Sequence, residues 1–61
     1  MHGQTVLSGE VLRATDAALL FSVDGRELWV PRRVCLDGDA ADVGDVDLHI
    51  ANWWLLKEGL L

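Results

Sequence analysis

The residues of this 61-residue chain with the clearest chemical potential, by type and spacing, are its aspartates. Five of them lie within eleven residues: Asp37, Asp39, Asp42, Asp45 and Asp47. Such a run can hold a cation, stay hydrated on a loop, or present the negative charge that DNA phosphates carry. With Asp37 and Asp39 at the first and third ligand positions of a calcium loop, Ala41 falls at the fifth. Leu48 then occupies the place of the bidentate glutamate, so a calcium loop does not fit. A solvated loop and a phosphate-like surface both remain compatible with the run.

The surplus negative charge belongs entirely to the second half of the chain. Residues 1–33 carry four acidic and four basic residues, whereas residues 34–61 carry six acidic residues and one basic residue, which gives the net charge of −5. This charge disfavours direct binding to nucleic acid, because phosphate contacts dominate that affinity. We expect instead a basic nucleic-acid-binding protein as the partner, approached by electrostatic steering. On a strand, Asp45 and Asp47 would lie about 6.6 Å apart on one face, a spacing of the same order as the roughly 3.4 Å between phosphates along one DNA strand.

The other reactive side chains form no catalytic set. Cys35 is the only cysteine, which excludes an internal disulfide and fits a reducing cytosol. Nearby Arg32 and Arg33 could lower its pKa, but without a histidine partner a small buried hydrophobe is the better interpretation. His2 and His49 are too far apart in sequence to form a motif. We therefore expect no enzyme, no cofactor and no metal site.

Tryptophans are the candidate anchors for a partner. Trp29 and Trp54 are the two that we expect to contact a partner, together with the aspartates. Trp53 and Trp54 point about 100° apart on a helix, so one belongs in the core and the other can rim an interface. Arg32 and Arg33 could pair with the aspartates across the loop, although exposed pairs contribute only ~0–1 kcal/mol each.

Four strands must position these residues. Period-two alternation and turn residues predict strands at Thr5–Arg13, Ala17–Val23, Arg26–Val30 and Asp45–Ile50. Gly9 predicts a bulge or bend in the first strand. Asp24 and Gly25 predict a type I′ turn between the second and third, because both residues tolerate positive φ.

The alternation also predicts which side chains face the core. We expect these to be Leu19, Phe21 and Val23, Leu28 and Val30, and Val46, Leu48 and Ile50. A short helix is expected at Trp53–Glu58, with Asn52 as its cap and Gly59 as its stop. The fold class is α+β and mainly β: one domain over residues 1–61, with a small, twisted antiparallel sheet of about four strands. The sheet should curl towards a partly open barrel, with the helix over its apolar face or open end.

The segment Thr15–Arg32 (TDAALLFSVDGRELWVPR) resembles small phage and prophage proteins, in which an Asp-Gly hairpin is followed by Glu-x-Trp, an apolar residue, proline and a basic residue. The segment Trp53–Leu60 (WWLLKEGL) resembles their closing segment, whereas Arg33 stands where a small polar residue is usual. In size and acidity the chain also resembles anti-CRISPR proteins.

That resemblance implies a non-enzymatic inhibitor in the host cytosol. It would bind, as a DNA mimic, the nucleic-acid-binding face of a Cas effector subunit, for example in a type I Cascade complex. The alternative is a phage accessory module for protein–protein interaction, either a monomer or a homodimer formed through exposed strand edges. The chain shows no signal peptide and no membrane span.

Overall fold

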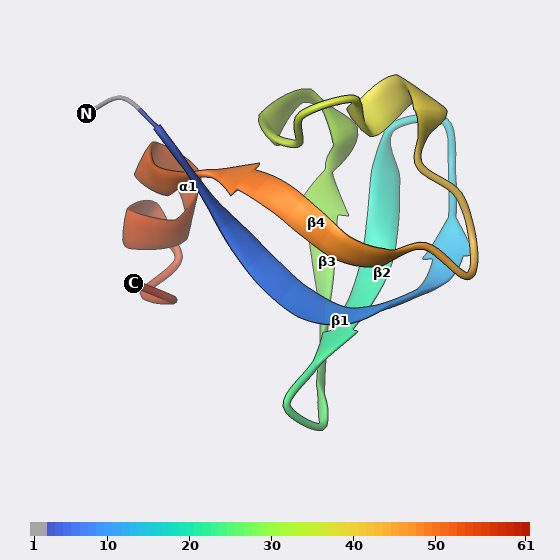
Figure 1. The fold of residues 1–61 in the computed structure, drawn as a ribbon, viewed down its shortest axis with the longest axis horizontal. Helices are drawn as coiled ribbons and strands as arrows, with labels where there is room; N and C mark the ends of the chain where they lie inside the picture. The colour runs from blue at the N-terminus through green and yellow to red at the C-terminus, as the bar shows by residue number, and fades with distance from the viewer. Residues whose placement is uncertain (1–2) are drawn as a thin grey trace.

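Alternating apolar and polar residues build a four-stranded antiparallel sheet with the order β3-β2-β1-β4 (Figure 1). The computed structural model describes residues 3–61, so His2 lies outside the described residues. The strands are β1 (Gln4–Ala14), β2 (Ala18–Val23), β3 (Arg26–Pro31) and β4 (Val46–Ala51). Two 3₁₀ turns, η1 (Arg32–Val34) and η2 (Gly38–Ala40), precede β4, and one helix, α1 (Asn52–Lys57), follows it. The expected fold class is confirmed.

The β2–β3 hairpin has the predicted turn. Asp24 has a φ of 51° and Gly25 a φ of 77°, so both central residues have the positive φ of a type I′ turn. Val23 pairs with Arg26 across it, and the register continues without a slip to the pair of Ala18 and Pro31. The turn therefore sets which face of each strand meets the core.

The core is formed by the inward side chains of all four strands and of α1. Its buried residues are Val11, Leu19, Phe21, Val30, Val34, Cys35, Leu48, Ile50, Trp54 and Leu55. Val23 and Leu28 pack against this cluster while remaining partly exposed. Val46 was expected to face inward, but it is 58% exposed. It is the first residue of an edge strand and pairs with the exposed Glu10 beyond a break in the register of β1, so its side chain lies outside the core.

Two irregularities bend β1 so that it can pair with a different partner on each side. Against β4 the register slips between Leu7 and Glu10, and against β2 it slips between Val11 and Arg13. Gly9 lies within the first slip, as predicted. A Cβ atom at Gly9 would collide with the carbonyl oxygen of Ser22 and lie 2.9 Å from Cζ of Phe21. Only glycine lets the two strands approach this closely.

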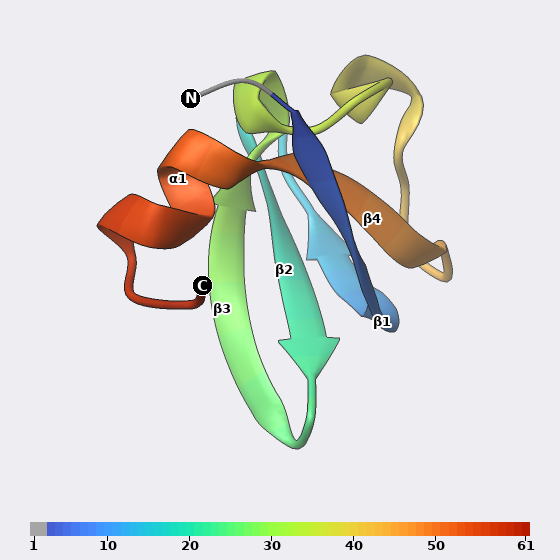
Figure 2. The same ribbon diagram turned by 60° about the vertical axis from the view of Figure 1, so that its left-hand side comes forward.

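The chain after β3 returns to the far edge of the sheet. Cys35 forms an isolated antiparallel bridge with Ile50, and the amide of Leu36 donates to the carbonyl of His49 at 2.9 Å. The sheet stays open between β3 and β4, but this contact curls it around the core. Figure 2 shows the result: α1 and the C-terminal residues lie on the β3 side of the sheet.

Helix α1 begins differently from the prediction and ends as predicted. Asn52 was expected to cap it, but Asn52 is its first residue, and the side-chain oxygen of Asn52 instead accepts a hydrogen bond from the hydroxyl of Thr5. At the other end Gly59 has a φ of 76°. The amide of Leu60 donates to the carbonyl of Leu55 at 2.8 Å. This is a Schellman ending, and it turns Leu60 back against the core.

The substitution Gly9→Ala should destabilise the protein by about 1–3 kcal/mol, the usual cost of forcing an extra carbon into a packed site. The matched control is Ser8→Ala, which removes an exposed hydroxyl from the neighbouring residue. Urea denaturation followed by circular dichroism measures both free energies of unfolding. Equal stability of the two variants would show that the close approach at Gly9 does not constrain β1.

Candidate functional site

All five aspartates of the run are exposed. We call this set (Asp37, Asp39, Asp42, Asp45 and Asp47) the acidic surface. It follows η1, includes η2, and ends at the beginning of β4. In Figure 1 this segment lies at the opposite end of the molecule from α1. The structure thus brings the sequence-predicted aspartates together on one segment.

Ala40 and Ala41 line two depressions of the acidic surface, and different aspartates line each of them. On one side, a shallow depression is lined by Asp37, Asp45 and Asp47, with Ala40 and Ala41 at its border. On the other side, Asp39 and Asp42 line a second depression, which Ala40 and Ala41 also border. Carboxylates therefore lie beside Ala40 and Ala41 in both depressions, and Ala41 also packs against the core.

Backbone geometry fixes where several of these carboxylates point. Asp37 has a φ of 55° and begins η2. The carboxylate of Asp45 accepts a hydrogen bond from the amide of Asp42 at 2.9 Å, and the amide of Asp45 donates to the carbonyl of Asp42 at 3.1 Å. Asp45 was expected in the last strand, on the same face as Asp47. It lies instead in the turn before β4, because its side chain closes that turn.

Arg32 organises the loop through the main chain, while its positive charge lies beside Asp39 and Asp42 in one of the two depressions. Its Nε donates to the carbonyl of Thr15 at 2.8 Å, and its Nη1 donates to the carbonyls of Gly38 and Ala41 at 2.7 Å each. All three acceptors are backbone oxygens. The interaction that we expected between Arg32 and the aspartates is thus replaced by one with the main chain. Arg33 is exposed and shares a depression with Asp37 and Asp39.

Apolar side chains lie among the carboxylates, and sequence reasoning missed them. Leu36, Val43 and Val46 are 52%, 58% and 58% exposed. Leu36 and Val46 line the same depression as three of the aspartates. The available signal was that Leu36 and Val43 stand in a loop, and Val46 at its end, with few apolar neighbours in sequence to bury them. An exposed mixture of apolar and charged groups is typical of protein-binding surfaces rather than of a solvated loop.

The division of the tryptophans into buried and exposed residues differs from the prediction. Trp54 was expected to contact a partner, but it is 6% exposed and belongs to the core. Trp53 takes the exposed position instead, because successive helical residues point in different directions. Trp29 is 50% exposed on β3, as expected for an anchor. Trp29 lines a groove between β3 and the C-terminal residues, not the acidic surface.

Cys35 is buried, which confirms that it packs as a small hydrophobe. Burial raises the pKa of its thiol above the ordinary value, and the nearby Arg32 guanidinium opposes this shift less strongly. Within residues 3–61, no three histidine, cysteine, aspartate or glutamate side chains gather closely enough to hold a metal ion. Among the same residues, no helix has the length and apolarity needed to cross a membrane.

Comparison with protein-family models, curated proteins and solved structures found no match to this chain. The resemblance of Thr15–Arg32 to small phage proteins stays a prediction from the residues alone. Functional inference therefore depends on the chemistry of the surfaces described above.

Cys35 should make the stability of the protein fall in alkaline solution. The folded protein holds the thiol proton more tightly than the unfolded chain, so this contribution is complete below the ordinary pKa of 9.0 and is lost as the pH rises above it. The free energy of unfolding, measured by urea denaturation between pH 7 and pH 10.5, should decrease more for the wild type than for Cys35→Ala. Parallel pH profiles would contradict this explanation.

The substitution Arg32→Lys should loosen the loop that carries the acidic surface. A lysine cannot reproduce the three hydrogen bonds of the guanidinium, so we expect a loss of about 2 kcal/mol in stability and faster amide exchange at Gly38 and Ala41. Arg33→Lys is the matched control on an exposed side chain. Unchanged exchange in Arg32→Lys would show that these bonds do not hold the loop.

Proposed function

We propose that this protein is a non-enzymatic inhibitor whose acidic surface binds a basic nucleic-acid-binding protein in place of nucleic acid. The single observation that carries the proposal is the depression shared by Asp37, Asp45 and Asp47 with the exposed Leu36 and Val46. Carboxylates there would meet the cationic groups that normally hold phosphates. The apolar residues would supply desolvated contact area, which charges alone do not provide.

The carboxylates of this surface are accessible to a partner, and those of Asp45 and Asp47 line a depression that contains no arginine. Each of the five aspartates is exposed, and the guanidinium of Arg32 is committed to backbone carbonyls. The side chains of Asp37 and Asp47 are free of the turn that engages Asp42 and Asp45. Together with the net charge of −5, this supports electrostatic steering towards a cationic cleft.

The two-sided shape suits insertion into a cleft. Carboxylates on both sides of Ala40 and Ala41 would face both walls of a groove lined by arginine and lysine. The finer form of the proposal is an anti-CRISPR protein whose target is a Cas effector subunit, with type I Cascade as the first complex to test. The protein would act in the cytoplasm of the host cell.

The test is whether the protein competes with DNA for purified type I Cascade. Binding of the protein to Cascade without DNA is measured by biolayer interferometry, and binding of DNA to Cascade by gel shift with increasing protein. We expect a direct complex, blocked DNA binding, and an affinity that falls by about tenfold or more when salt is raised from roughly 50 to 200 mM. Failure to bind Cascade would remove that target. Failure also to bind an arginine-rich peptide would contradict the acidic-surface mechanism itself.

The variant Asp37→Asn/Asp47→Asn tests which charges act. These two carboxylates form none of the hydrogen bonds that shape the loop, so the fold should be preserved. We expect about tenfold weaker binding, mostly from slower association. The variant Asp24→Asn/Glu58→Gln makes the same change in net charge at exposed sites outside the acidic surface and should bind Cascade like the wild type. Equal weakening by both variants would mean that only net charge matters.

A further inference from the structure

The outer edge of β3 carries backbone groups without partners. Val23 and Arg26 flank a two-residue turn, so each donates a backbone hydrogen bond to the other. Bonded and non-bonded pairs alternate along an antiparallel ladder, so Leu28 and Val30 are the next residues of β3 that bond to β2. The amides and carbonyls of Glu27 and Trp29 therefore point away from β2. β3 is the last strand on this side of the sheet. Within residues 3–61, no other segment donates to these two residues or accepts from them.

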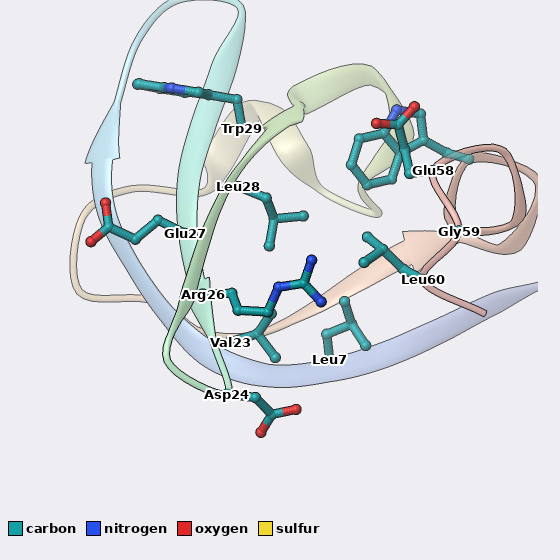
Figure 3. A pocket seen from close by; sticks show the side chains of 11 residues that line it. Leu7, Val23, Asp24, Arg26, Glu27, Leu28, Trp29, Glu58, Gly59 and Leu60 are labelled. Atoms are coloured by element: carbon teal, nitrogen blue, oxygen red, sulfur yellow. The ribbon is translucent and has the colours of Figure 1, made fainter.

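A groove runs beside this edge. It has a volume of roughly 490 Å³, within the range of ligand-binding clefts, and separates β3 from the residues at the end of α1. Figure 3 shows Leu28 and Arg26 pointing from β3 into the groove, with Leu60 and Glu58 on the opposite wall. Trp54 completes the apolar part of the lining. The groove thus offers an apolar floor next to a row of unused backbone hydrogen-bonding groups.

The two faces of β3 specify the chemistry of an added strand. Glu27 and Trp29 point away from the groove, on the other face of β3 from Leu28 (Figure 3). A basic side chain opposite Glu27 would pair with its carboxylate and lie near the indole of Trp29, which attracts cations. A residue next to it in sequence would point to the groove side, where Leu28 and Leu60 favour an apolar group. The charged residues that line the groove besides Glu27 are Asp24, Glu58 and Arg26, so acidic groups lie on both faces of β3 and favour a basic occupant.

We propose that the edge of β3 binds a short extended segment of another protein, in which basic and apolar residues alternate, as a fifth strand of the sheet. The added strand would bond to the amides and carbonyls of Glu27 and Trp29. Pro31 has no amide hydrogen, so the pairing is limited to a few residues. A second copy of this chain is the less favourable occupant, because each copy carries a net charge of −5.

This binding site is separate from the acidic surface. It uses β3 and the end of α1, whereas the aspartates lie on the segment between η1 and β4. The inhibitor function and the strand site can therefore fail independently. Variants in β3 should leave binding to an arginine-lined cleft unchanged if the strand site alone is affected.

The experiment uses the whole protein, labelled with ¹⁵N, and a blocked synthetic hexapeptide of alternating lysine and valine. Titration followed by heteronuclear correlation spectra should give saturable shifts at Glu27, Trp29 and Leu60. The amides of Glu27 and Trp29 should exchange with solvent at least about tenfold more slowly in the complex, which corresponds to binding about tenfold above its dissociation constant. Shifts confined to Asp37–Asp47 would overturn the proposal, because they would report only attraction to the acidic surface.

Two variants and two further peptides separate strand addition from general attraction. The variant Trp29→Pro removes an outward backbone amide that the sheet does not use, and it should weaken peptide binding by about tenfold. The variant Trp53→Ala changes an exposed tryptophan that does not line the groove, and it should have little effect on peptide binding. If Trp29→Pro does not fold, a peptide N-methylated at alternate amides gives the same test on the wild-type protein. A peptide of alternating glutamate and valine should not bind.

Two further outcomes would overturn the proposal. Equal affinity of the N-methylated and unmodified peptides would exclude backbone pairing. A dimer of the free protein in analytical ultracentrifugation, with protected amides at Glu27 and Trp29 before any peptide is added, would show that a second copy occupies the edge.

Discussion

The guanidinium of Arg32 gathers three carbonyl oxygens from separate parts of the chain: Thr15 in the β1–β2 turn, Gly38 in η2, and Ala41 beyond it. A loop of about fourteen residues would otherwise have many conformations, and fixing each residue costs roughly 1–2 kcal/mol. The buried Gly38 allows this arrangement, since a Cβ there would collide with the carbonyl of Arg32. This one side chain therefore fixes the part of the loop that carries Asp37, Asp39 and Asp42.

The hairpin and the core could be predicted from sequence because local chemistry determines them. Asp24 and Gly25 dictate one turn type, and that turn sets the register for Leu19, Phe21 and Val30. Gly9 could be recognised as a bend for the same reason. These residues interact with neighbours in sequence or alternate along one strand, so no knowledge of distant contacts is required.

The errors arose where distant segments compete for a residue. Asn52 has the chemistry of a cap, but Thr5, 47 residues earlier in the chain, takes its side-chain oxygen. Val46 continues an alternating pattern past the register shift in β1, where it pairs with the exposed Glu10. Trp53 and Trp54 are equivalent in the sequence, and only the docking of α1 decides which one is buried. Arg32 was expected to pair with carboxylates, but its guanidinium donates instead to backbone carbonyls that the fold places around it.

The strand order has a consequence for how the chain folds. β2 and β3 are joined by two residues, whereas the pair of Gln4 with Ala51 closes nearly the whole chain. Because closing a long loop costs entropy before any contact compensates, the hairpin is expected to form early and the β1–β4 ladder late. The segment that carries the acidic surface lies in sequence between the hairpin and β4. It would be ordered only when β4 joins the sheet, so the nascent protein gains its binding face in the last step of folding.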